Sequence, residues 1–128
     1  MIEVYELSKR YGERLAVDQA SFSAARGQIL GFLGPNGAGK STTMRMLTGF
    51  LPPSSGSGRV AGFDIVEEAD EVRRRIGYLP ENPPLYPDMT VSAYLSFVAR
   101  LKGVPSRQLR SARDEVMERT GLTAVAGR

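Results

Sequence analysis

Residues 29–42 read Ile29-Leu30-Gly31-Phe32-Leu33-Gly34-Pro35-Asn36-Gly37-Ala38-Gly39-Lys40-Ser41-Thr42, and this stretch decides the fold. Its first five residues are apolar and predict a buried strand. Residues 34–41 satisfy the pattern G-x-x-x-x-G-K-[ST], and residues 42–47 can continue as a helix. A strand, a glycine-rich loop and a helix in this order are the context that a phosphate-binding loop needs. The sequence therefore predicts a nucleoside-triphosphate site.

The residue types of this loop fit the chemistry of a triphosphate. Glycines at positions 34, 37 and 39 let the backbone curl, so that successive N–H groups point inward and form an anion site. The positive end of the helix that begins near Lys40 strengthens that site. Lys40 then reaches the β- and γ-phosphates and stabilises their charge, and Ser41 places its hydroxyl on Mg²⁺. We expect ATP and Mg²⁺ as ligands, with the nucleotide bound by Gly34, Pro35, Asn36, Gly37, Ala38, Gly39, Lys40, Ser41 and Thr42.

An ordinary turn between a strand and a helix is the alternative explanation of this loop. A glycine-rich turn alone would leave that alternative open. Here a lysine and a serine follow the last glycine in register, and both are residues that the phosphate-binding pattern requires. The nucleotide site is therefore favoured over the turn.

Composition sets limits on the kind of protein. The chain has 128 residues, which is about one domain, and its 41% hydrophobic and 24% charged residues are typical of a soluble globular protein. A net charge of +3 fits a polyanionic ligand and is too weak to indicate nucleic acid. The chain has no cysteine and no histidine, so disulfides, thiolate chemistry and the usual general base are excluded. We expect neither a signal peptide nor a membrane-spanning helix.

Apolar periodicity predicts an α/β front portion. Short strands are expected at 1–7, 20–24, 29–33, 59–61 and 76–79, and a turn at Tyr11-Gly12. The helix of the loop is expected to end near Leu47. A second helix carries Val66, Ala69, Val72 and Ile76 on one side and ends in three arginines, Arg73 to Arg75, which we interpret as a solvated helix end.

The character of the chain changes at about residue 88. Thr90 is expected to cap a helix whose apolar side carries Val91, Tyr94, Leu95, Val98 and Leu101. Ser106 is expected to cap another, which carries Leu109, Ala112 and Val116 inward and ends at Gly121. The sequence thus predicts a nucleotide-binding core at 1–87 and the beginning of a helical subdomain at 88–128.

These residues resemble the ATP-binding subunits of ATP-binding-cassette (ABC) transporters over nearly the whole chain. The loop at 34–42 has the form that this family favours, and Leu7-Ser8-Lys9-Arg10-Tyr11-Gly12 is similar to its adenine-stacking loop. Residues 47–53, Gly56, Gly58 and 62–65 follow the family's spacing, and 76–80 lead into its Q-loop. The resemblance is greatest to bacterial exporters. It implies a P-loop NTPase fold with an antiparallel β portion, here with an incomplete central sheet.

The resemblance assigns roles to two further residues. An aromatic beside a glycine is more often a packed turn, but the family match implies that the ring of Tyr11 stacks on adenine. The family usually has Gln at the position of Glu81, where the side chain approaches Mg²⁺ and the attacking water. A carboxylate there is either a stronger Mg²⁺ ligand with a part in catalysis or a surface acid at a strand end, and both interpretations stay open.

The family also has parts that are absent from these 128 residues. They are a Leu-Ser-Gly-Gly signature, a Walker-B strand ending in Asp-Glu and a switch histidine. In the family two cassettes face each other, and hydrolysis needs all of these parts. The resemblance therefore implies an ATPase. In such a protein, the complete pair of cassettes couples ATP binding and hydrolysis to membrane export. The 128 residues alone are expected not to be catalytically competent.

The resemblance implies partners and a location as well. The partners are ATP, transmembrane permease subunits and a second nucleotide-binding subunit, and no nucleic acid is expected. The location is cytoplasmic, peripheral on the inner face of the cell membrane through the permease. The transported substrate is chosen by the membrane subunits, so this sequence does not name it.

Other functions stay open at this point. One is a truncated gene product that only binds nucleotide or is inert, for which the missing signature and Walker B are the argument. Reading the coding DNA beyond Arg128 separates it from the first interpretation. Another is a non-transport ABC protein that acts on ribosomes or DNA, against which the lack of a basic patch counts. A small GTPase or a nucleoside kinase is disfavoured by the missing Asn-Lys-x-Asp motif and by the ABC-like flanks of the loop.

Overall fold

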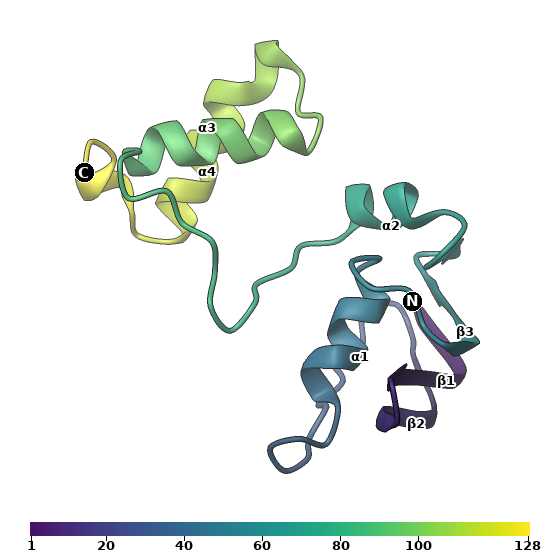
Figure 1. The fold of residues 1–128 in the computed structure, drawn as a ribbon. Helices are drawn as coiled ribbons and strands as arrows, with labels where there is room; N and C mark the ends of the chain where they lie inside the picture. Colours follow the sequence, from purple (N-terminus) through teal and green to yellow (C-terminus); the bar gives the residue numbers. More distant parts are fainter. The chain divides into compact units, whose positions relative to one another are not determined.

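A computed structural model describes all of residues 1–128, which form two compact units, 1–78 and 79–128 (Figure 1). The first unit contains strands β1 (Ile2–Tyr11), β2 (Arg14–Ala24), β3 (Ser55–Val60) and β4 (Phe63–Asp64) and helices α1 (Lys40–Leu47) and α2 (Ala69–Arg75). The second contains helices α3 (Val91–Leu101) and α4 (Leu109–Arg119) and two 3-10 turns, η1 (Ser106–Gln108) and η2 (Thr123–Val125). The domain boundary expected after residue 87 stays a prediction. None of the helices combines the length and apolar composition that a membrane crossing requires.

The first unit is built on one antiparallel sheet with the strand order β2-β1-β3-β4. Along β2, exposed and more buried side chains alternate as expected. The serines at 21 and 23 are exposed, and Ala24 is buried. The hydrophobic core lies between this sheet and the two helices and contains Val4, Leu7, Val17, Met46, Leu47, Val60, Ile65 and Val72. The sheet thereby provides a rigid backing for α1, which follows the glycine-rich loop.

The β1–β2 hairpin is longer than expected and has two irregular positions. Its turn is Gly12–Glu13, whereas we predicted Tyr11-Gly12, because Tyr11 still pairs with Arg14. Glu6 and Gln19 both have a φ of +45°, where the register of the hairpin shifts. The backbone N–H of each donates to a serine hydroxyl of the opposite strand at 2.8 Å, from Glu6 to Ser21 and from Gln19 to Ser8. These hydrogen bonds satisfy donors that the irregular ladder leaves unpaired.

The strands predicted at 29–33 and 76–79 are absent from the structure. The backbone of 28–35 has no regular structure, and the side chains of Ile29 and Leu33 are 98% and 95% exposed. Only Phe32 is anchored there, by packing on Phe22 with ring centroids 5.3 Å apart. Leu79 is likewise 81% exposed. A strand needs a neighbouring strand for its hydrogen bonds, and none of the four strands pairs with these segments.

The helices follow the predicted pattern with several corrections. Helix α2 is shorter than expected, because it begins at Ala69 and leaves Val66 exposed. The Oγ1 atom of Thr90 accepts a hydrogen bond from the N–H of Ala93 at 3.1 Å, so the predicted cap of α3 is confirmed. Leu101, which we expected to face inward, is 71% exposed.

Helix α4 differs from its prediction at its beginning and on its inner side. Ser106 does not cap it, because a 3-10 turn of residues 106–108 comes first and α4 begins at Leu109. Met117, and not Val116, is the buried residue near its end. A backbone hydrogen bond joins the beginning of α3 to residue 128 in this second unit. The N–H of Val91 donates to the carbonyl of Arg128 at 2.8 Å.

Candidate functional site

The glycine-rich loop folds back on its own lysine. The Nζ atom of Lys40 donates hydrogen bonds to the carbonyl oxygens of Gly34 at 2.5 Å and Pro35 at 2.7 Å. The N–H of Ala38 donates to the same Pro35 carbonyl at 3.2 Å. The residues at 34–38 are exposed and Lys40 is half-buried. The ammonium group thus lies at the mouth of the loop, where an anionic ligand can reach it.

Two glycines give the loop its curvature. Gly37 and Gly39 have φ angles of +84° and +89°, a region that residues with a Cβ rarely adopt. At Gly34 a Cβ would lie 3.1 Å from the Cβ of Ala38, so this close approach also favours glycine. The two glycines that the motif prescribes, Gly34 and Gly39, therefore have a structural reason, and so does Gly37 between them. They leave backbone N–H groups available for a phosphate.

Strand β2 supports the far side of the loop. A Cβ on Gly39 would lie 2.3 Å from the carbonyl oxygen of Ala16 and 2.9 Å from Cγ2 of Val17. Thr43, one turn into α1, is 1% exposed and donates its hydroxyl to the Gly39 carbonyl at 2.9 Å. The first turn of α1 is thus fixed between the sheet and the core. Ser41 is exposed on that turn.

Tyr11 lies at the end of β1, and its ring is 45% exposed. The Nζ atom of Lys9 lies 5.5 Å from the centroid of the ring. Across the hairpin, Tyr11 pairs with Arg14, two residues before Ala16, whose carbonyl faces Gly39. The hairpin therefore brings Tyr11, which is partly exposed, to the part of the sheet that backs the loop.

Comparison with known proteins now adds to this geometry. The family described as ABC transporter matches residues 17–128. The chain belongs to the ABC transporter family. The resemblance inferred from the motifs is thus confirmed, and so is the mixed α/β fold class.

The relatives of this ABC-family chain include ATP-binding proteins of bacterial exporters. It is 39% identical over 126 residues to the probable multidrug ABC transporter ATP-binding protein YbhF of Escherichia coli, covering 98% of this chain and 22% of that protein. It is 43% identical over 118 residues to the Nod factor export ATP-binding protein I of Ralstonia nicotianae, covering 92% of this chain and 37% of that protein. The chain thus spans less than half the length of these curated relatives.

A solved structure supports the fold of the ABC-family chain. It is described as the structure of an ATP-binding subunit of an ABC transporter, and the two structures match with a TM-score of 0.86 at 27% identity. The match covers 98% of this chain and 52% of the other. The fold of these residues is therefore that of a portion of an ABC ATP-binding subunit.

Glu81, for which a Mg²⁺ ligand and a surface acid both stay open, belongs to a different unit from the loop. It is exposed, and it belongs to residues 79–128, whereas the loop belongs to residues 1–78. The role of Glu81 stays a prediction.

Reasoning from the sequence of the ABC-family chain missed two contacts at the loop. One is the support that Ala16 and Val17 give to Gly39, and the other is the buried hydroxyl of Thr43. The first contact joins residues 22 and 23 positions apart, so no local pattern signals it. The second had a signal, because a threonine four residues after Gly39 in a helix can donate to that carbonyl.

Proposed function

We propose that this chain binds ATP with Mg²⁺ in an ABC transporter ATPase and that ATP binding and hydrolysis drive export through a membrane partner. The observation that carries the proposal is the loop before α1, in which Gly37 and Gly39 have left-handed backbone and the Lys40 ammonium donates to the carbonyl oxygens of Gly34 and Pro35. Membership of the family supports ATP as the nucleotide. The exporter relatives support the direction of transport.

The residues of the loop would act by binding and charge stabilisation. Lys40 would exchange the carbonyl oxygens of Gly34 and Pro35 for phosphate oxygens, which carry a full negative charge and form stronger hydrogen bonds. The N–H groups of the loop would hold the same phosphates. Ser41 is exposed on the first turn of α1, and its hydroxyl oxygen is a ligand type suited to Mg²⁺. When bound, Mg²⁺ would supply positive charge that offsets the negative charge of the phosphates.

The second unit has an apolar surface that indicates a binding partner for the ABC subunit. An apolar hollow of about 340 Å³ is lined by Leu85, Tyr86, Pro87, Met89, Val91, Tyr94, Leu95 and Leu122. The ring of Tyr86 packs against those of Tyr94 and Phe97, with centroids 6.3 and 5.9 Å apart. Tyr86 and Leu85 are nevertheless more than half exposed. Exposed aromatic and apolar residues around a hollow are typical of a protein-binding surface, and we assign it to the permease.

The proposal is tested by measuring MgATP binding and hydrolysis with the protein expressed from its complete reading frame. Binding is followed by displacement of a fluorescent ATP analogue, and hydrolysis is followed with and without the membrane partner. We expect binding by the subunit alone and hydrolysis that rises when the partner is present. A protein that is folded by circular dichroism and does not bind MgATP would end the proposal.

Stacking of Tyr11 on adenine gives a separate prediction. Replacing Tyr11 by alanine should weaken MgATP affinity about fivefold or more, because base–aromatic stacking contributes roughly 1–3 kcal/mol. Replacing it by phenylalanine should preserve the affinity. Tyr5→Ala is the matched control, because it removes another tyrosine from β1 that is 65% exposed. Equal affinities of the alanine and phenylalanine variants of Tyr11 would exclude the stacking role.

Glu81 is tested through magnesium. If its carboxylate binds Mg²⁺, Glu81→Gln should raise the Mg²⁺ concentration for half-maximal nucleotide binding about threefold, because an amide is a weaker ligand than a carboxylate. The measurement is a Mg²⁺ titration at fixed ATP. Asp88→Asn is the control, because it neutralises another exposed acid of the same unit. Superimposable titrations of the wild-type and Gln proteins would make Glu81 a surface acid.

A further inference from the structure

The helix that begins at the phosphate-binding loop is also fixed at its other end. Helix α1 ends at Leu47, and two residues later Gly49 turns the chain with a φ of +69°. A Cβ on Gly49 would lie 3.0 Å from the Cβ of Ala69, the first residue of α2. The C-terminal end of α1 therefore touches α2 at a glycine, as its N-terminal end touches β2 at Gly39.

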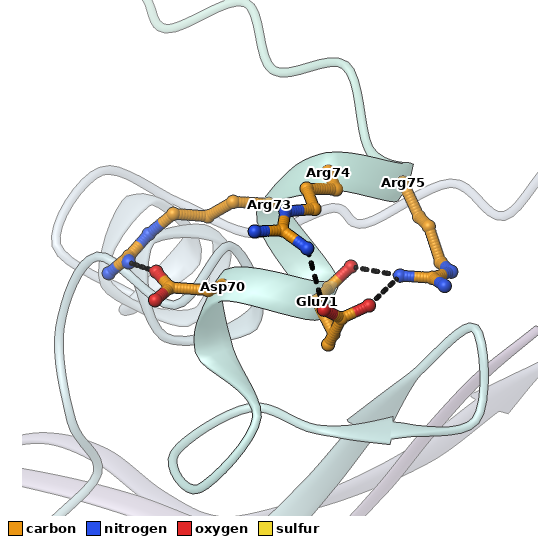
Figure 2. Close-up of polar contacts among 5 residues, drawn as sticks. All are labelled: Asp70, Glu71, Arg73, Arg74 and Arg75. Carbon is orange, nitrogen blue, oxygen red and sulfur yellow. Dashed lines mark hydrogen bonds and ion pairs between the residues drawn. The ribbon is translucent and has the colours of Figure 1, made fainter. Parts of the chain in front are cut away.

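Arg73 of α2 joins these two helices. Its guanidinium group donates a hydrogen bond to the carbonyl oxygen of Gly49, 24 residues earlier in the chain. The Nη1 atom of the same group lies 2.7 Å from Oδ1 of Asp70, which holds the side chain in this direction (Figure 2). A cation at the C-terminal end of a helix is favourable, because the last carbonyl groups carry partial negative charge.

The neighbouring arginines point elsewhere. Figure 2 shows Arg74 and Arg75 both directed to the carboxylate of Glu71, at 2.9 and 2.5 Å. Arg75 also lies over the ring of Phe63 in β4, 4.1 Å from its centroid. From the sequence, we interpret Arg73 to Arg75 together as a solvated helix end. In the structure Arg73 binds the end of α1, and Arg75 packs on β4.

We propose that Arg73 is a positioning residue of the nucleotide site, acting through α1 on Lys40 and Ser41. An α-helix of eight residues is a stiff rod about 12 Å long, so a displacement at one end moves the other. The turn after α1 and the first residue of α2 also approach each other closely, at Gly49 and Ala69. The guanidinium bond sets the distance between them and thereby the angle at which Lys40 enters the loop. This inference rests on the proposed function, because it assumes a nucleotide at that loop.

The experiment compares two adjacent arginines in the protein expressed from its complete reading frame. Arg73→Met removes the contact with Gly49, and Arg74→Met removes the same charge from the same helix without touching α1. Arg73→Lys restores a cation that can reach one carbonyl. For each protein we would measure the MgATP affinity, the thermal midpoint and the ³¹P chemical shift of the β-phosphate in bound MgADP. A loss of stability alone would not change this chemical shift.

We expect Arg73→Met to weaken MgATP binding about 3- to 10-fold and to shift the β-phosphate resonance, because misplacement of the loop lysine weakens its phosphate contact. Arg74→Met should match the wild-type protein, and Arg73→Lys should recover most of the affinity. Equal affinities and resonances for the Met variants would overturn the inference, even if Arg73→Met melts earlier. If Arg73→Met does not fold, Arg73→Lys decides alone: a displaced β-phosphate resonance with a measurable loss of affinity relative to Arg74→Met supports the inference, and a resonance and affinity equal to those of Arg74→Met overturn it. A wild-type protein that does not bind MgATP would overturn the proposed function together with this inference.

Discussion

Replacing Lys40 by alanine is expected to weaken MgATP binding about 100-fold, which corresponds to about 2.7 kcal/mol. In the structure the Lys40 ammonium is held by the carbonyl oxygens of Gly34 and Pro35, at the mouth of the loop. A triphosphate offers it charged oxygens in the same place, and charge-assisted hydrogen bonds are about twice as strong as neutral ones. Alanine at position 40 keeps the helix and removes only this charge.

The same substitution should leave the fold nearly unchanged. The carbonyl groups that Lys40 releases belong to exposed residues, so water can take its place. We therefore expect a thermal midpoint close to that of the wild-type protein, together with the loss of affinity. Lys102→Ala is the control, because it removes one lysine from the second unit. An affinity of the Lys40 variant equal to that of this control would exclude the phosphate site.

The sequence predicts those features of the loop that depend on neighbouring residues. Glycine at 37 and 39 marks the positions with positive φ, because these conformations are strained for every residue with a Cβ. The cap at Thr90 follows a local rule of the same kind, since the hydroxyl needs only the N–H three residues later. These predictions are confirmed because the physics that decides them acts within a few residues.

Features that depend on distant pairing were not predicted. Residues 29–33 have the apolar composition of a strand buried in a parallel sheet, but composition does not provide the strand that must pair with them. Their side chains are consequently exposed where we expected burial. The contact of Arg73 with Gly49 is a second example, because a charge run in a sequence does not show which carbonyl each guanidinium reaches.

The irregular positions of the hairpin had no signal at all. Glu6 and Gln19 adopt positive φ without being glycine or asparagine, the residues that favour it. The structure tolerates them because hydroxyl groups of the opposite strand satisfy their N–H groups. Which serine serves this purpose depends on the register of the two strands, and alternation along one strand does not reveal it.

A second large effect is expected for Gly39→Ala, which should destabilise the first unit by about 3 kcal/mol or more and remove nucleotide binding. Two costs add at this position. The φ of +89° is unfavourable for alanine by about 1–2 kcal/mol. The new methyl group would also lie 2.3 Å from the carbonyl oxygen of Ala16, which is backbone and cannot rotate away.

Gly37→Ala separates these two costs, because Gly37 has nearly the same φ, +84°, and nothing within 4 Å of the added Cβ. We expect it to cost only the conformational part, about 1–2 kcal/mol. The measurement is thermal unfolding of both variants without nucleotide. The difference between the two midpoints then reports the clash with β2 alone. Equal midpoints would show that the loop is not pressed against β2, and the support that Ala16 gives to the loop would have to be abandoned. A larger loss at Gly39 would show that the loop takes its position from the sheet as well as from its glycines.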